Sequence, residues 1–166
     1  EMGIADDTII CVWGDHGYHL GEHGHWGKVT NYEEAACAPL IISAPGFPGG
    51  VMSVSLTEFL DVYPTLCELA GLPLPDHLQG TSLVPLMRNS STRIHEAVLS
   101  QCSTVDTKMG QQLLSGLLDE EGVRGGIESA MGWSLRSPRY RYVEWRKAML
   151  NGNERTFGAK VLAVEL

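Results

Sequence analysis

The chain has 166 residues, 43% of them hydrophobic, and a formal net charge of −8. This length and composition allow one ordinary domain with a real core, and no apolar run is long enough to span a membrane. The acidic balance excludes a broad electrostatic surface for nucleic acid or anionic lipid, so neither is expected as a partner.

The N-terminal part of the chain predicts an α/β arrangement. Thr8 to Trp13 is a continuous run rich in β-branched residues, which predicts a strand buried on both faces in a parallel sheet. Asn31 to Cys37 predicts a short helix, and Pro39 to Pro45 a second apolar strand. A clear helical pattern follows, with Asp61 expected as its N-cap and Gly71 as its left-handed C-terminal cap.

The character of the chain changes after residue 92, and we expect two domains, 1–92 and 93–166. Ser103 to Met131 is poorly patterned, although Gln111 to Asp119 predicts a helix. Short strands without long intervening helices indicate a small antiparallel sheet. The predicted strands are Ala97 to Gln101, Gly132 to Arg136, Tyr140 to Arg146 and Ala159 to Leu166.

Polar side chains are concentrated directly after the first strand. Asp15 and His16 follow Gly14, and Lys28 lies further along the same loop. In open α/β sheets, ligands collect at the carboxyl ends of the strands, and a carboxylate beside an imidazole suits a metal ion. Taken alone, an Asp-His-Gly triplet is also ordinary turn chemistry. The same loop contains Glu22, His23 and His25.

The sequence GDHGYHLGEHGHWGK, from Gly14 to Lys28, resembles the metal-and-lysine segment of the sulfatases in the alkaline-phosphatase-like superfamily. It is most similar to the iduronate-2-sulfatase type. The resemblance implies an α/β fold in which the C-terminal part of the catalytic domain, a parallel-sheet segment, is followed by a small antiparallel subdomain. Further agreeing segments are Ala38 to Ile42, Asp61 to Gly71, Gly80 to Leu86, Gly132 to Arg136 and Arg139 to Trp145.

The resemblance implies a sulfuric ester hydrolase acting on sulfated sugars or glycosaminoglycans, in a periplasmic, secreted or lysosomal setting. Asp15 and His16 would be ligands of a calcium ion, and Lys28 would bind a sulfate oxygen. A divalent ion and a fixed ammonium both stabilise charge on an oxyanion. Calcium prefers oxygen ligands, so the imidazole by itself would favour zinc or manganese.

Other residues of the loop have two interpretations each. His23 could protonate the leaving group as a catalytic acid, or it could bond loop backbone. Glu22 is expected to pair with a neighbour or cap backbone, whereas Tyr18 and His25 could line a substrate pocket or pack, as could His19. A solvated sheet face is the default for the arginines at 136, 139, 141 and 146, and His77 and His95 show no functional pattern.

The attacking group of such an enzyme is missing from this chain. In the family a formylglycine is made from Cys or Ser in a C/S-x-P-x-R motif. Cys37 and Pro39 fit the start of that motif, but Ile41 stands where arginine is required. We therefore expect a segment truncated at both ends, whose partner is the N-terminal remainder of the enzyme. Alone it should expose apolar surface and be inactive.

Two other functions remain open from the sequence. One is a phosphonate or phosphate-ester hydrolase of the same superfamily, whose loop is closely similar. The other is a non-catalytic carbohydrate-binding or interaction fragment, in which Asp15 and His16 would have only structural roles.

Overall fold

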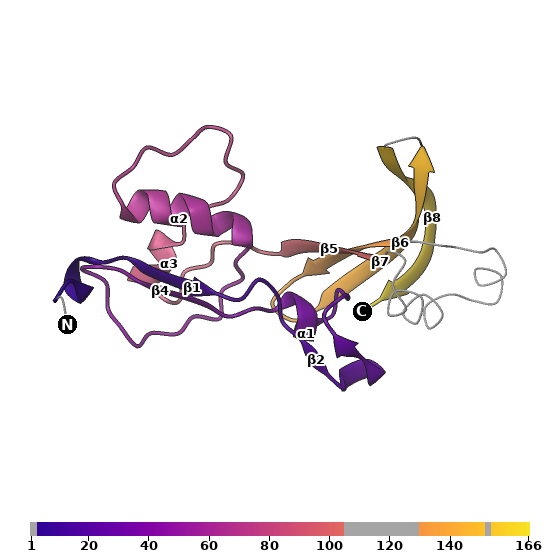
Figure 1. Cartoon of the computed structure of the whole chain (residues 1–166), viewed down its shortest axis with the longest axis horizontal. Coiled ribbons are helices and arrows are strands. Elements are labelled where there is room, and N and C mark those ends of the chain that lie inside the picture. Colours follow the sequence, from indigo (N-terminus) through magenta and orange to yellow (C-terminus); the bar gives the residue numbers. More distant parts are fainter. Residues whose placement is uncertain (1–2, 105–129, 152–153) are drawn as a thin grey trace. The chain divides into compact units, whose positions relative to one another are not determined.

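A computed structural model describes residues 3–104, 130–151 and 154–166 (Figure 1). The described chain forms two compact units, one from Glu1–Gly14 with Pro39–Val98 and one from Asp15–Ala38 with Leu99–Leu166. This grouping differs from the expected domains, which placed the candidate metal loop with the first 92 residues. The helix expected over Gln111 to Asp119 lies outside the described residues.

The first unit contains a two-stranded ribbon of β1 (Ile10–Trp13) and β4 (Leu40–Ser43), after a short 3-10 helix, η1 (Ala5–Asp7). The strands pair antiparallel, with Ile10 opposite Ser43. The expectation of a parallel strand buried on both faces was therefore wrong for these residues. Ile10, Val12 and Trp13 are 47%, 56% and 51% exposed, because within the described ranges β4 is the sole strand beside β1. The predicted exposure of apolar surface is confirmed here.

The helical part of this unit comprises η3 (Phe59–Asp61), α2 (Val62–Leu69) and α3 (Val84–Arg88). Helix α2 confirms the predicted helix. It ends at Leu69, and the expected left-handed glycine, Gly71, follows with a φ of +67°. The Leu72 N–H then donates to the Cys67 carbonyl at 2.9 Å.

Asp61 lies at the N-cap position of α2, as predicted. Its carboxylate makes no capping bond to that helix; it is fully buried and accepts hydrogen bonds from the backbone N–H groups of Glu58 and Thr81, each 2.8 Å long. His95 Nε2 lies 2.8 Å from the same carboxylate. Asp61 thus joins three separate segments of this unit, and we call Asp61 with these three partners the Asp61 cluster.

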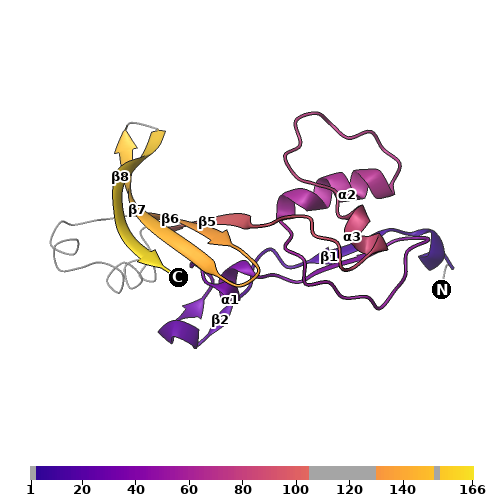
Figure 2. The ribbon, with the colours of Figure 1, turned by 180° about the vertical axis from the view of Figure 1, so that it is seen from behind.

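The second unit is built on a four-stranded sheet in the order β5 (Val98–Thr104), β6 (Ala130–Arg136), β7 (Arg141–Asn151) and β8 (Glu154–Glu165) (Figure 2). The pairs β6–β7 and β7–β8 are antiparallel, which confirms the predicted antiparallel sheet. Its core is made by Ala130, Val143 and Trp145, with Tyr32, Leu162 and Ala163 packed against it.

Asp15–Ala38, the segment that we call the site segment, belongs to this second unit. It contains a small antiparallel pair, β2 (His19–Leu20) and β3 (Trp26–Gly27), joined by η2 (Glu22–Gly24), and it ends in the predicted helix, α1 (Glu33–Ala36). The segment packs closely on the sheet. A Cβ at Gly132 of β6 would lie 2.5 Å from Asn31 Nδ2 and 2.8 Å from the Trp145 ring, so only glycine fits without movement.

None of the helices in the described ranges is both long and apolar enough to cross a lipid bilayer.

Candidate functional site

His16 lies between the two other predicted site residues. Its Nε2 is 2.6 Å from Lys28 Nζ and 3.4 Å from Asp15 Oδ1, and its Nδ1 is 2.6 Å from the Gly17 carbonyl oxygen. A carbonyl can only accept and an ammonium can only donate, so the hydrogen of His16 is on Nδ1 and its Nε2 offers a lone pair. The structure therefore brings Asp15, His16 and Lys28 together.

The Asp15 and His16 donors fit part of a coordination shell for a divalent ion. The side chain of Asp15 is 82% exposed and that of His16 is 32% exposed. The Nε2 lone pair of His16 accepts from Lys28, so an ion bound by His16 would replace this hydrogen bond. Among the residues that the structure describes, no group of three or more His, Cys, Asp or Glu side chains is placed to hold a metal. A calcium ion takes six to eight oxygen ligands. Any such ion would therefore need ligands from outside these residues.

Backbone hydrogen bonds fix the chain next to His16 and next to Lys28. On one side, the Gly17 N–H donates to the Ala35 carbonyl at 2.8 Å, and a Cβ at Gly17 would lie 1.9 Å from the Glu34 carbonyl oxygen. On the other side, the Thr30 N–H donates to the Lys28 carbonyl at 2.9 Å. The residue after His16 must therefore be glycine, because a side chain would collide with backbone that cannot move aside.

Thr30 connects the lysine end of the site to the start of α1. Its buried hydroxyl oxygen lies 2.7 Å from His19 Nε2 and accepts the Tyr32 N–H at 3.3 Å. His19 is fully buried, and burial, which disfavours the charged imidazolium, lowers its pKa. A neutral His19 thus supports the loop between Lys28 and α1.

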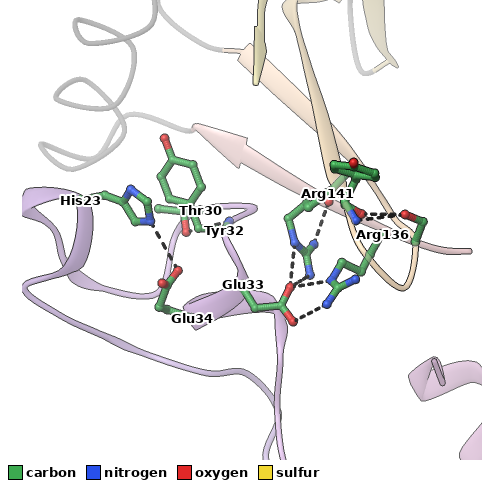
Figure 3. A network of polar contacts seen from close by, with 10 residues as sticks. His23, Thr30, Tyr32, Glu33, Glu34, Arg136 and Arg141 are labelled. Atoms are coloured by element: carbon green, nitrogen blue, oxygen red, sulfur yellow. Dashed lines mark hydrogen bonds and ion pairs between the residues drawn. The ribbon is translucent and has the colours of Figure 1, made fainter. Parts of the chain in front are cut away.

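His23 lies in a cluster of rings beside this support. Its backbone has a φ of +55°, its ring stacks on Tyr32 with centroids 4.3 Å apart, and its Nε2 is 3.7 Å from Glu34 Oε2 (Figure 3). The rings of His19 and His25 lie 5.9 and 6.3 Å from that of Tyr32. The role of His23 as a catalytic acid stays a prediction.

The other predicted loop residues differ in their surroundings. Glu22 accepts the Leu20 N–H at 2.6 Å, so the expected backbone cap is confirmed, and hydrogen bonds from its own and the Leu20 N–H lower the pKa of Glu22. Tyr18 is 54% exposed and His25 is half-buried. Their contact with a substrate stays a prediction.

The sequence did not indicate the ion pairs of Glu33. Its Oε2 accepts from Arg136 Nε at 2.9 Å and from Arg141 Nη2 at 2.7 Å, so these two arginines are not merely solvated (Figure 3). Arg146 pairs with Glu144 at 2.5 Å, and Arg139 lies over the ring of its neighbour Tyr140. Glu33 is 103 and 108 residues from its partners, so no local pattern could have revealed them.

These contacts alter the titration of Glu33. Partial burial raises the pKa of its carboxyl, but hydrogen bonds and charge from Arg136 and Arg141 outweigh burial and hold the pKa below its usual range. The carboxylate is therefore charged at neutral pH.

Comparison with known proteins gives a family match for residues 21–101, to the model described as N-sulphoglucosamine sulphohydrolase, C-terminal. Arylsulfatase K of Rattus norvegicus is 36% identical over 91 residues, which is 55% of this chain and 16% of that protein. N-acetylglucosamine-6-O-sulfatase of Bacteroides thetaiotaomicron is 39% identical over 90 residues, 54% of this chain and 16% of that protein. The chain thus spans about a sixth of these relatives.

A solved structure, the phosphonate monoester hydrolase from Silicibacter pomeroyi, shares the fold with a TM-score of 0.66 and 31% identity. The similarity covers 86% of this chain and 27% of that one. The alkaline-phosphatase-like fold expected from the sequence is confirmed by this likeness.

Proposed function

The chain belongs to the sulfatase family of the alkaline-phosphatase-like superfamily, and from this premise we propose that it is part of a sulfuric ester hydrolase for sulfated sugars. The observation that supports the proposal is the convergence of Asp15, His16 and Lys28, with His16 Nε2 within 2.6 Å of the ammonium and 3.4 Å of the carboxylate. An anionic ester needs local positive charge, and in this acidic chain the exposed Lys28 supplies it.

In this proposal each of the three residues has one task. Lys28 binds a sulfate oxygen, where a fixed ammonium stabilises negative charge that develops during hydrolysis. Asp15 Oδ1 and His16 Nε2 would hold a divalent cation, proposed to be calcium, and Lys28 would then give up its hydrogen bond to His16 and turn to the sulfate. When bound, that cation would supply Lewis-acid polarisation of the ester. The attacking formylglycine would come from residues outside this chain.

The substrate class is proposed from the name of one relative and from the resemblance of the loop. A relative named for N-acetylglucosamine-6-O-sulfatase activity favours a sulfated sugar, and the loop resembles the iduronate-2-sulfatase type. Tyr18 and His25 would line the sugar pocket, and His23 would protonate the leaving group. Degradation of glycosaminoglycans in a periplasmic, secreted or lysosomal compartment would suit such an enzyme.

A second function has its own support. The similarity to a phosphonate monoester hydrolase favours hydrolysis of phosphonate or phosphate esters at the same three residues. The two candidate reactions need the same local positive charge, so the site geometry alone does not separate them.

The test uses the full-length protein that contains this chain. Purified enzyme is assayed against aryl and sugar sulfate esters and against phosphonate and phosphate esters. Lys28→Ala should lower kcat/KM for the preferred ester by ~10²–10³-fold, the range for losing a donor to a developing oxyanion. Lys147→Ala, which removes another exposed lysine, should leave kcat/KM unchanged.

The outcomes are distinct. A preference for sulfate esters together with the Lys28 effect supports the sulfatase proposal, and a preference for phosphonate or phosphate esters moves the function to the second candidate. Wild-type kcat/KM in Lys28→Ala overturns the site. The 166-residue chain alone is expected to hydrolyse neither kind of ester.

A further inference from the structure

We propose that Glu33 is a positioning residue for Lys28: clamped by Arg136 and Arg141 of the C-terminal sheet, it fixes the segment that carries the anion-binding ammonium. The inference rests on the proposed function, because it concerns the same lysine. We call Glu33, Arg136 and Arg141 the Glu33 clamp.

The clamp joins α1 to two strands at once. Arg136 is the last residue of β6 and Arg141 the first of β7, and the two are directly opposite each other in the sheet. Arg136 donates to both carboxylate oxygens, through Nε at 2.9 Å and Nη2 at 3.4 Å. Arg141 donates to Oε2 through Nε at 3.1 Å and Nη2 at 2.7 Å. Planar guanidinium groups fix both distance and orientation in such pairs.

The sheet side of the clamp is itself rigid. Arg141 Nη1 also donates to Ser134 Oγ at 2.7 Å, and Ser134 is fully buried in β6. The arginine side chains are 23% and 15% exposed, against 47% for Glu33. Arg141 is therefore held by the buried Ser134 as well as by Glu33, and both guanidinium groups are less exposed than the carboxylate that they bind.

A second attachment lies next to the first along the chain. Tyr32, the residue before α1, donates its hydroxyl to Glu165 Oε1 of β8 at 2.5 Å, and Trp145 Nε1 donates to the other oxygen at 3.2 Å. Burial and the Glu165 carboxylate both raise the pKa of Tyr32, so this hydroxyl stays protonated as a donor. Neighbouring residues 32 and 33 are thus fixed to three different strands.

Two short paths lead from the clamp to the site. Ala35, two residues after Glu33, accepts the Gly17 N–H beside His16, and Thr30 links the Tyr32 N–H to the Lys28 carbonyl. Helix α1 has only four residues, and isolated helices of that length do not form in water. The position of Lys28 therefore depends on what holds α1.

The experiment is a double-mutant cycle in the full-length enzyme with the ester that it hydrolyses best. Glu33→Gln keeps the size of the side chain and removes its charge. It should lower kcat/KM by ~10–100-fold, since a misplacement of about 1 Å can cost 10²-fold. In a Lys28→Ala background the same change should have a clearly smaller effect, because the part that acts through the ammonium is already lost.

A matched control is Glu144→Gln, which breaks the Glu144–Arg146 pair on β7 without touching the site segment. It should leave kcat/KM unchanged in both backgrounds. Arg141→Lys keeps the positive charge but loses the planar guanidinium that donates to Glu33 through two nitrogens. It should therefore lower kcat/KM as much as Glu33→Gln does. If Glu33→Gln does not fold, Arg141→Lys tests the same ion pair from the arginine side.

The proposal is overturned if Glu33→Gln lowers kcat/KM equally with and without Lys28, or if both clamp variants behave like the control. Amide hydrogen exchange tests the clamp without relying on enzyme activity. If the enzyme hydrolyses none of the esters, the function fails, but the clamp still predicts faster amide exchange over residues 15–32 in Glu33→Gln than in Glu144→Gln. Equal exchange in those two variants overturns the clamp itself.

Discussion

Two aspartates show how differently this chain uses the same side chain. Asp61 is fully buried and has three hydrogen-bond partners at 2.8 Å, two from backbone N–H groups and one from His95. Asp15 is 82% exposed, and its contact with His16 is 3.4 Å long. Asp61 uses its acceptor capacity on the protein, whereas Asp15 keeps most of its own available.

This difference distinguishes a carboxylate that stabilises the fold from one that is available to a ligand. A buried carboxylate is stable only when its lone pairs are satisfied within the fold, so nothing remains for a ligand. An exposed carboxylate beside an imidazole and an ammonium gives little stability, because surface pairs contribute about 0–1 kcal/mol. Its acceptor oxygens are therefore free for a cation, and changes at the two aspartates should have opposite consequences.

The largest effect is expected from Asp61→Ala. It removes the acceptor of two backbone N–H groups and of His95, and losing one partner of such a buried arrangement costs about 3–5 kcal/mol. Chemical denaturation of the full-length protein measures this change in the free energy of unfolding. Asp15→Ala, measured in parallel, should alter it by no more than about 0.5 kcal/mol. Similar losses in the two variants would contradict the comparison.

Asp15→Ala should instead weaken metal binding. Removing a residue that only orients a metal ligand costs about 10–100-fold in affinity, so a coordinating carboxylate should cost at least ~100-fold. Calorimetric titration of the full-length enzyme with calcium, zinc and manganese measures the affinity. Unchanged Kd values for all three ions would remove Asp15 from the metal site.

Two glycines offer a matched test of packing in the two regions. A Cβ at Gly80, beside the Asp61 cluster, would lie 1.9 Å from the backbone carbonyl oxygen of Leu60, whereas at Gly132 it would meet the side chains of Asn31 and Trp145. Side chains can shift, so Gly132→Ala should cost about 1–3 kcal/mol, a typical overpacking penalty. Gly80→Ala should cost more. Thermal unfolding of both variants measures the two losses of stability. A larger loss in Gly132→Ala than in Gly80→Ala would refute this reasoning.

The smallest expected effect is the loss at low pH of the stability that the Glu33 clamp contributes. The folded-state pKa of Glu33 lies below its ordinary value of 4.5, so the clamp contributes its full stability above pH 4.5 and loses it as the pH falls through the folded-state value. The difference in melting temperature between wild type and Glu33→Gln should accordingly be constant near neutral pH and shrink below pH 4.5. A difference that grows on acidification would contradict the assigned direction.

Much of the local structure could be predicted from the sequence. The helical spacing before Gly71 located α2, and short strand-forming runs without long intervening helices located the C-terminal strands, because these patterns depend on residues close together in the chain. The proximity of Asp15, His16 and Lys28 was implied by the resemblance of the segment from Gly14 to Lys28 to the sulfatases. These three lie within fourteen positions of one another, so one loop suffices to bring them together.

Other features depended on distant residues and could not be predicted. The apolar run of β1 indicated a strand but not its direction, since continuity reports hydrophobicity and not the partner strand. His95 showed no pattern because Asp61, its partner, is 34 residues away. The N-cap position of Asp61 was predicted correctly, but its bonds to Thr81 and His95 were not, because these partners are 20 and 34 residues away.

The separation between Glu33 and its two arginines also has a consequence for synthesis. A ribosome adds about 5–20 residues per second, so roughly 5–20 s pass between the emergence of Glu33 and that of Arg136 and Arg141. During that interval the segment of α1 lacks the ion pairs of Glu33 with both arginines, and four residues do not form a stable helix by themselves. Lys28 is thus translated early but ordered late, once β6 and β7 have left the exit tunnel.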